Sequence, residues 1–363
     1  MERFGLVGFP NSGKSSLFNA LTGSSALAAP FPFATKEAHV GMAAVPDRRL
    51  NLLAEMSSSA KCTPAQVQFC DIGGIVEGAS QGEGLGNQLL SHIREVEAIV
   101  YVLQVFETKD LPQEHDPLSQ LHILEMELSL ADFDSTQRQL ERRTRQARSD
   151  PSIREEVALL EKAAQVLAEG VPIYRSELSD EEKIALSANF LLTNKPIMVL
   201  ANLGEEILDT GSSVAGNSTA DLGEDLPQAE VMGMCVRLEE EVAQLPSEDQ
   251  GEMLQELGLG EGALAEFASA ARKLLSLYTF FTTGEKESRA WTFKAGSTAR
   301  ECAGAIHTDF EKGFIRAETI ACEDLLAIGS WTAAKQAGKI RAEGRDYLTQ
   351  DGDVMEFRFT APR

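Results

Sequence analysis

The sequence predicts an α/β protein with a helical insertion and a smaller α+β domain at its C-terminal end. Three observations predict this division. A glycine-rich loop separates a strand from a helix near the start, strands and helices then alternate, and the pattern changes near residues 118 and 276. The 363 residues suffice for about two or three domains with a substantial core.

The first strand and helix frame a phosphate-binding loop. Apolar residues 3–7 predict a strand, residues 16–21 predict a helix, and residues 8–15 match G-x-x-x-x-G-K-[ST] without a mismatch. Loop N–H groups and the positive end of the helix dipole attract phosphate. Lys14 is expected to reach the β- and γ-phosphates, and the Ser15 hydroxyl to bind Mg²⁺. The candidate nucleotide-binding residues are Asn11, Ser12, Gly13, Lys14, Ser15 and Ser16.

Two further segments supply the other groups that a nucleotide switch requires. Thr35 lies in a loop after the first helix, where a threonine in phosphate-loop GTPases and ATPases closes over the γ-phosphate and completes the Mg²⁺ shell. Residues 67–71 predict a strand that ends at Asp71, which is expected to hold Mg²⁺ through water. Gly74 completes a D-x-x-G pattern and is expected to offer its N–H to the γ-phosphate.

Ile75 occupies the position where many such GTPases carry the glutamine that orients the attacking water. Isoleucine cannot hydrogen-bond to water, so the sequence predicts slow hydrolysis or a group supplied from elsewhere. Residues 78–86 contain four glycines, which predicts a mobile loop of the kind that senses the nucleotide.

Residues 118–190 predict an antiparallel coiled-coil hairpin. Leu121, Leu124 and Leu128 share one helical face, Pro151 breaks the pattern, and residues 157–167 are amphipathic again. A run of arginines lies towards the tip and is either a solvated helix face or a contact for RNA or another acidic partner. These arginines are Arg138, Arg142, Arg143, Arg145 and Arg148.

The second α/β part lacks the guanine-reading N-K-x-D motif at the expected place. Residues 194–196 begin like that motif, but Ile197 replaces its aspartate and the triplet precedes the strand 197–201. After this strand come Asn202 and Glu205. They stand where the guanine-reading motif is expected, but the residues there do not match N-K-x-D. The Ser- and Gly-rich residues 211–221 predict a loop.

From Ser276 onward the pattern is that of a small α+β domain. Residues 291–296 predict a strand and turn, and residues 297–306 a helix that Ser297 or Thr298 caps. Residues 351–353 predict a turn into a final strand. This part offers no catalytic constellation.

Charge and composition limit the partners. The formal net charge of −23 argues against non-specific binding to nucleic acid, and no sequence-specific DNA binding is expected. From Ser276 onward there are 12 basic and 13 acidic residues, so the first 275 residues carry a net charge of −22. No apolar run is long enough for a membrane span, and the first strand leaves no room for a signal peptide. Five scattered cysteines predict reduced thiols and a cytoplasmic protein.

Together these residues resemble the YchF/Obg-like ATPase family of translation-associated phosphate-loop proteins. The resemblance covers nearly the whole chain and includes Ile75, because the family carries a hydrophobic residue there. Its marks are residues 8–15, residues 31–33 with Thr35, residues 71–74 and 78–86, residues 278–291 and residues 307–317. The last stretch is similar to the family's C-terminal TGS domain.

The resemblance implies a P-loop NTPase G domain in two parts, residues 1–117 and 191–275. A helical coiled-coil insertion of residues 118–190 separates them, and an α+β, ubiquitin-like TGS domain follows at residues 276–363.

The resemblance also implies an activity: slow hydrolysis of ATP with Mg²⁺, with Lys14, Thr35 and Gly74 at the reacting phosphate. ATP is preferred over GTP, and Asn202 and Glu205 stand on the family's N-x-x-E. A histidine from the loop 106–117 acts in hydrolysis in such relatives. His115 is the only histidine of that loop, and a solvated turn residue is the alternative interpretation.

The implied partner is the ribosome, bound through the coiled coil and the TGS domain, in a regulatory role in translation or stress response. Two alternatives stay open. One is an Obg-class GTPase, against which stands the absent N-K-x-D after Ala201. The other is a nucleotide-occupied ribosome-binding module whose turnover is incidental.

Overall fold

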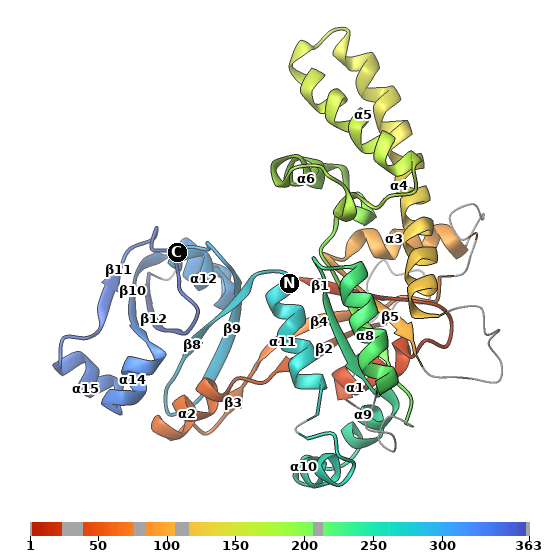
Figure 1. The fold of residues 1–363 in the computed structure, drawn as a ribbon. Coiled ribbons are helices and arrows are strands. Elements are labelled where there is room, and N and C mark those ends of the chain that lie inside the picture. The colour runs from red at the N-terminus through yellow and green to blue at the C-terminus, as the bar shows by residue number, and fades with distance from the viewer. Residues whose placement is uncertain are drawn as a thin grey trace. The chain divides into compact units, whose positions relative to one another are not determined.

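The computed structural model describes residues 2–23, 39–75, 78, 85–105, 116–205, 213–260 and 262–360. Its contacts divide the chain into two compact units, Met1–Met42 with Gln68–Leu264 and Ala43–Val67 with Ala265–Arg363. Each unit is built around a six-stranded sheet (Figure 1). Within the described residues, no helix combines the length and the apolar character needed to cross a membrane.

The first unit contains the α/β sheet that the sequence predicts. Strands β4, β1, β5, β6 and β7 pair in parallel. Every residue of β5 is buried, as expected for a central strand that is covered on both faces. In spatial order the strands are β2 (His39–Val45), β4 (Ala65–Asp71), β1 (Arg3–Val7), β5 (Ala98–Gln104), β6 (Ile197–Asn202) and β7 (Glu230–Met234).

Helices connect and extend this sheet. The α-helices are α1 (Lys14–Thr22), α3 (Leu85–Glu95), α4 (Pro117–Ala147), α5 (Arg154–Ala168), α6 (Asp180–Leu186), α8 (Ser213–Asp225), α9 (Val236–Ala243) and α10 (Ser247–Glu256). The next helix, α11 (Leu264–Leu274), belongs to the second unit from Ala265 onward. Short 3₁₀ helices are η2 (Pro151–Ile153), η3 (Ile173–Arg175), η4 (Ser187–Asn189) and η5 (Leu192–Asn194).

Helix α8 corrects the prediction of a loop at residues 211–221, because the helix begins at Ser213. Strands β6 and β7 are parallel neighbours, and such strands need a crossover, usually a helix. Leu222 in the helix and Leu226 directly after it are fully buried and anchor the helix in the core. The need for a helical crossover between β6 and β7 therefore outweighs the loop preference of the Ser- and Gly-rich sequence.

The predicted hairpin is confirmed. Helix α4 runs for 31 residues, with Asp116 as its N-cap and a proline in its first turn, and α5 returns beside it. Figure 1 shows the two helices extending side by side away from the sheet. A separate apolar cluster packs the hairpin against the segment that follows it, which contains η3 and α6. Its buried residues include Leu160, Leu167, Ile173 and Leu186.

A buried carboxylate joins α4 to the chain that leads into β6. Asp132 has no exposed surface, and it accepts hydrogen bonds from Leu192 N at 2.9 Å, from Thr193 N at 2.7 Å and from Thr193 Oγ1 at 2.7 Å. Burial raises the pKa of Asp132 to about 6, and these hydrogen bonds oppose that rise.

The second unit is the predicted α+β domain. In spatial order its strands are β11 (Arg341–Glu343), β10 (Phe314–Ala321), β12 (Asp353–Phe359), β8 (Leu277–Thr282), β9 (Ser288–Lys294) and β3 (Cys62–Thr63). Its helices are α2 (Arg48–Met56), α12 (Ala299–Ile306), α13 (Thr308–Lys312), α14 (Cys322–Ile328) and α15 (Trp331–Gln336). Thr298 caps α12 in a capping box with Glu301, which confirms one of the two predicted caps.

Residues 43–67 belong to this second unit by their contacts, whereas the expected division placed them in the first part of the G domain. Strand β3 pairs with β9 through Cys62 and Ser288, and Arg49 Nη1 lies 2.8 Å from Asp351 Oδ2. These partners are more than 200 residues away along the chain, roughly the scale of a whole domain, so local pattern does not reveal them.

We expect Asp132→Ala to lower the free energy of unfolding by at least about 2 kcal/mol, because it leaves buried donors at Leu192 and Thr193 without an acceptor. Urea denaturation measures this. The exposed neighbour Asp134, changed to Ala, is the matched control, and equal stability of the two variants would contradict the assignment.

The same carboxylate predicts a pH dependence. The folded state keeps the Asp132 proton up to about pH 6, whereas the unfolded chain loses it near the ordinary aspartate pKa of 3.8. The contribution of this group to stability is therefore full below that value and falls as the pH rises towards 6. Asp132→Ala should lack this component of the stability–pH curve, and Asp134→Ala should retain it.

Candidate functional site

The phosphate loop lies at the carboxyl end of β1, which pairs with β4 on one side and β5 on the other. Ligand sites of open α/β sheets form at such strand ends. A Cβ on Gly8 would lie 2.3 Å from the Val102 carbonyl oxygen. A Cβ on Gly13 would lie 2.2 Å from Asn202 Nδ2, and Gly13 also has a positive φ of 98°. Gly8 is therefore required by the close approach of another backbone segment, and Gly13 by the Asn202 side-chain amide and its own positive φ.

Helix α1 begins directly after this loop with free N–H groups. Gly13 is its N-cap and provides no side-chain hydrogen bond, and the first turn holds no acidic residue. Ser15 is exposed, Ser16 is half-buried, and Asn11 is exposed with a positive φ of 65°. The buried Ser12 Oγ has no hydrogen-bond partner among the residues that the structure describes. An uncapped helix start behind a tight turn suits an anionic ligand.

Lys14 is folded back over its own loop. It is only 6% exposed, and its Nζ donates a hydrogen bond of 2.6 Å to the Phe9 carbonyl. Burial lowers the pKa of Lys14 to about 8, and the nearby Asp71 carboxylate opposes that shift. The side chain thus holds a positive charge at neutral pH in a poorly solvated position.

Asp71 stands beside Ser15 because β4 pairs with β1 and places Asp71 opposite Leu6. Ser15 Oγ donates a hydrogen bond of 2.7 Å to Asp71 Oδ2. The other carboxylate oxygen, Oδ1, is buried and has no hydrogen-bond partner in the described part of the chain. A hydroxyl next to an unsatisfied carboxylate oxygen fits the oxygen ligands and the water shell of Mg²⁺.

Gly74 packs directly against the phosphate loop. A Cβ on Gly74 would lie 2.7 Å from Pro10 N, so only glycine fits. The following N–H, from Ile75, donates a hydrogen bond of 3.0 Å to the Gly8 carbonyl. The D-x-x-G segment and the phosphate loop are therefore joined through backbone.

Asn202 braces the phosphate loop from the end of β6. Its Nδ2 donates to the Ser12 carbonyl at 3.0 Å, and its Oδ1 accepts from Val236 N at 3.2 Å. The residue is 5% exposed. The amide therefore holds the phosphate loop against the first residue of α9.

Glu205 is exposed beyond the same strand and is paired. Its Oε1 lies 3.0 Å from Arg237 Nη1, and Arg237 Nε lies 3.3 Å from Glu241 Oε1. The sequence analysis missed Arg237. The only signal for it is its position in the first turn of the helix that follows β7, the strand next to β6.

Comparisons with known proteins agree with this geometry. The profile described as "50S ribosome-binding GTPase" matches residues 3–139. The C-terminal profile of YchF GTPases, described as "Protein of unknown function (DUF933)", matches residues 277–360. The chain is 44% identical to "Ribosome-binding ATPase YchF" of Bacillus subtilis (strain 168) over 98% of each chain. It belongs to the YchF family.

Other relatives are also similar to this chain over nearly their full length. The protein called "Ribosome-binding ATPase YchF" in Mycoplasma genitalium is 40% identical, again over 98% of each chain. The solved structure of the YchF GTPase of Schizosaccharomyces pombe matches with a TM-score of 0.84 and 32% identity, covering 98% of this chain and 97% of that one. The YchF relationship thus includes both units.

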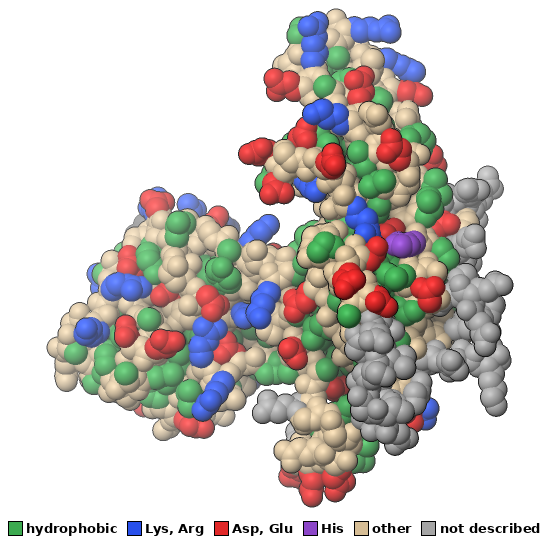
Figure 2. Space-filling model, in the orientation of Figure 1, with side chains coloured by type: hydrophobic (Ala, Val, Ile, Leu, Met, Phe, Trp, Pro, Cys, Tyr) green, Lys and Arg blue, Asp and Glu red, His purple; other side chains and the backbone are tan. Residues whose placement is uncertain are grey.

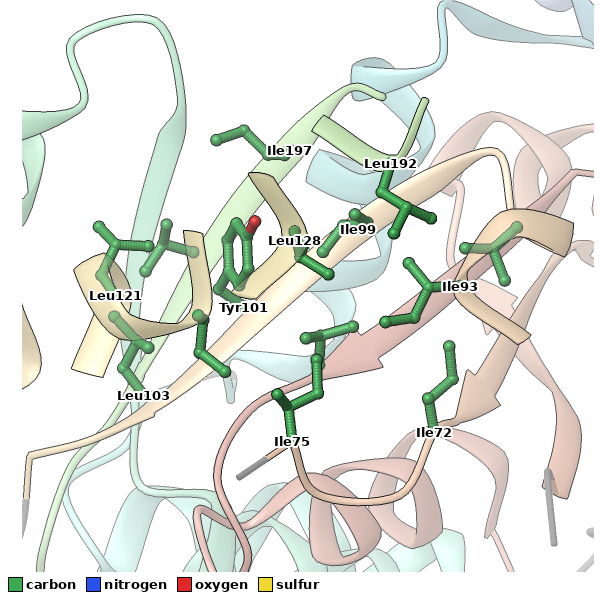
Figure 3. Packing of buried hydrophobic residues seen from close by; sticks show 14 of the residues in the cluster. Ile72, Ile75, Ile93, Ile99, Tyr101, Leu103, Leu121, Leu128, Leu192 and Ile197 are labelled. Carbon is green, nitrogen blue, oxygen red and sulfur yellow. The ribbon is translucent and has the colours of Figure 1, made fainter. Parts of the chain in front are cut away.

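In this YchF-family chain, Ile75 does not face the site. Its side chain is 1% exposed and belongs to an apolar cluster with Ile72 and Ile93. Figure 3 shows it directed into that cluster. The position of the usual catalytic glutamine is therefore part of the core.

Some predicted site residues lie outside the described residues. These are Thr35, His115 and most of the glycine-rich segment 78–86. Gly78 is described, and its N–H donates a hydrogen bond of 2.6 Å to Glu127 Oε1 on helix α4. The sequence analysis missed Glu127, because nothing local distinguishes a buried glutamate in a long helix from a solvated one.

The position of Lys14 predicts a pH dependence of ATP binding. With its pKa lowered to about 8, the free protein loses this positive charge as the pH rises above that value. Binding to phosphate then requires proton uptake, so the dissociation constant should rise by up to about tenfold per pH unit above the pKa. Isothermal titration with ATP between about pH 7 and pH 10 measures it. Lys14→Met should bind more weakly and without this dependence, and a flat wild-type curve would contradict the assignment.

Because Ile75 is buried, we predict that a glutamine at this position does not speed hydrolysis and destabilises the fold. Ile75→Gln buries an amide without a partner and should lower the free energy of unfolding by about 1–3 kcal/mol without raising the hydrolysis rate. Ile75→Val is the control that keeps an apolar side chain, with a loss of about 0.5–1.5 kcal/mol. A glutamine variant that is as stable as wild type and hydrolyses faster would refute this.

Proposed function

We propose that this chain is a ribosome-binding ATPase that hydrolyses ATP slowly and acts as a switch in translation. The observation that carries the proposal is the arrangement at the end of β6. Asn202 braces the phosphate loop there, and the exposed Glu205 takes the position in which guanine-specific proteins carry the aspartate of N-K-x-D. The bacterial relatives are named ribosome-binding ATPases, which supports the same activity here.

The triphosphate is bound by the loop and the start of α1. Backbone N–H groups from Asn11 to Ser16 hold the phosphate oxygens, and the free helix N-terminus adds its positive dipole. Lys14 exchanges its hydrogen bond to the Phe9 carbonyl for the β- and γ-phosphate oxygens. Because its ammonium group is poorly solvated before binding, little hydration is lost in that exchange.

Mg²⁺ neutralises charge that develops on the phosphate oxygens. Ser15 and Thr35 would hold it directly, and Asp71 through water. The buried, unpaired Asp71 Oδ1 fits this role, because a metal-bound water can donate to it. Within the described parts of the chain, no three His, Cys, Asp or Glu side chains gather as a metal cluster, so phosphate and water supply the remaining ligands in this proposal.

Hydrolysis is slow in this proposal because no glutamine orients the water. Gly74 offers its N–H to the γ-phosphate, and Ile75 is turned into the core. Loss of a charge-stabilising or water-positioning group in such enzymes costs about 10³–10⁵ in rate. We assign the water-positioning role to His115 or to a group of the partner.

Adenine selection is assigned to Glu205. Adenine presents an exocyclic amine, and a carboxylate accepts a hydrogen bond from it. Arg237 holds the Glu205 carboxylate at 3.0 Å. The coiled-coil hairpin and the C-terminal unit are assigned to ribosome contact.

Affinity measurements separate the roles of Asn202 and Glu205. Asn202→Ala removes a brace of the phosphate loop and should weaken ATP and GTP by a similar factor of about 5 to 100. Glu205→Gln removes the carboxylate and should reduce the ATP-over-GTP preference by about 10-fold or more. Isothermal titration with both nucleotides and Mg²⁺ measures these effects.

Glu241 is a second exposed carboxylate that pairs with Arg237. Glu241→Gln is therefore the matched control, because it removes a carboxylate partner of Arg237 and keeps Glu205. It should leave the preference unchanged. A wild type that prefers GTP would make the Obg-class alternative correct, and the solved relative from Schizosaccharomyces pombe is described as a GTPase. ATP binding without turnover, alone or with ribosomes, would favour the non-enzymatic binding module.

A further inference from the structure

A pocket of about 350 Å³ lies beside the hairpin, lined by residues of α4, the start of α5, the end of α3 and η4 with the residue that follows it. Its charged lining consists of Arg94, Arg142, Arg143 and Glu156, and Phe190 stands beside them. The volume is at the lower end of the range for pockets that take small molecules. None of these residues belongs to the nucleotide site described above.

Phe190 is difficult to explain by folding alone. Its side chain is 68% exposed, although it is a large apolar residue. Its backbone has φ 54° and ψ 40°, a left-handed conformation that is unfavourable for a residue of this size. Neither burial nor backbone preference favours a phenylalanine here, so an exposed ring in this position points to a partner.

The backbone around Phe190 is held in place by an amide pair. Asn189 Nδ2 donates to Gln139 Oε1 at 2.9 Å, and Gln139 Nε2 donates to the Asn189 carbonyl at 3.2 Å. Asn189 is 9% exposed. These bonds fix η4 to α4, so the ring projects from a rigid element and not from a free loop.

The arginines give the pocket a positive charge in a strongly acidic protein. Arg143 Nε lies 2.8 Å from Glu156 Oε1, whereas the side chains of Arg94 and Arg142 have no hydrogen bond or ion pair within the described residues. The charged lining thus has a formal net charge of about +2, against −23 for the whole chain. Two guanidinium groups are available for an anionic partner.

We propose that this pocket binds one unpaired nucleotide of an RNA strand, with the base stacked on Phe190 and its phosphates bound by Arg94 and Arg142. Stacking on an aromatic ring and charge pairing to the backbone are how proteins hold single-stranded RNA. The inference deepens the proposed function, on which it rests, because it assigns an RNA contact to the hairpin.

A strand fits the pocket better than a free nucleotide does. Residues 135–154 hold six arginines and only two acidic residues. Arg138 lies on α4 between the lining residues Ser135 and Gln139, and Arg145 and Arg148 continue the positive charge from Arg142 towards the hairpin tip, along about 9 Å of helix. Figure 2 shows Lys and Arg side chains gathered at that end of the hairpin. A free nucleotide has no phosphates to reach them.

Fluorescence anisotropy with a labelled oligouridylate tests the pocket, with the full-length protein held in excess ADP and Mg²⁺. Phe190→Gly removes the ring and relieves the left-handed backbone, so the fold should be at least as stable as wild type. Affinity for the oligonucleotide should fall by about 5- to 100-fold. Phe190→Tyr should retain binding.

Ile184→Ala is the control, because Ile184 is an equally exposed apolar residue on α6 outside the pocket lining. It should bind like wild type. Arg142→Ala should reduce the slope of log affinity against log salt by about 0.7, the value for one phosphate contact on a single strand.

Unchanged oligonucleotide binding in Phe190→Gly overturns the inference. Displacement of the oligonucleotide by uridine monophosphate at equal nucleotide concentration also overturns it, because the site then takes free nucleotides. Ribosome co-sedimentation of the wild type tests the proposed function separately. Ribosome binding without oligonucleotide binding refutes the pocket alone, and absence of ribosome binding refutes the proposed function.

Discussion

The hydrogen bond from Asn202 to the Ser12 carbonyl connects the two halves of the candidate site. It brings the end of β6 against the phosphate loop, and Gly13 must lack a Cβ because the amide occupies that space. The same side chain holds Val236 and so the start of α9, which carries Arg237. In the proposed function, phosphate binding and base selection therefore depend on one buried amide.

Helix α4 connects this site to the hairpin. Near its start Gln120 bonds to both backbone groups of Gln104 at the end of β5, and Glu127 holds the Gly78 N–H. Asp132 then fixes the helix to the segment before β6. These are contiguous packed contacts between Gly78, in the segment predicted to sense the nucleotide, and a helix that reaches the arginine-rich tip, and they are the kind of contacts through which coupling can travel.

The most reliable predictions from the sequence were the features that a few consecutive residues determine. The phosphate loop, the D-x-x-G segment, the hairpin and the Thr298 cap each follow from a short local pattern. Arg237 and Glu127 did not, because their partners Glu205 and Gly78 come together only in the folded chain. The packing of residues 43–67 with the C-terminal unit and the helix α8 also depend on distant strands. Asn202 was predicted as a base-side residue, and the structure adds its bond to the phosphate loop.

The most direct test of the account is the affinity for ribosomes in two nucleotide states. Dissociation constants are measured by co-sedimentation with saturating ADP and with a non-hydrolysable ATP analogue, each with Mg²⁺. A switch requires that the partner bind the two states unequally, because a ligand with equal affinity for both shifts nothing. We predict a difference of about 5-fold or more, the range of ordinary allosteric coupling. Equal affinity in the two states would contradict the account.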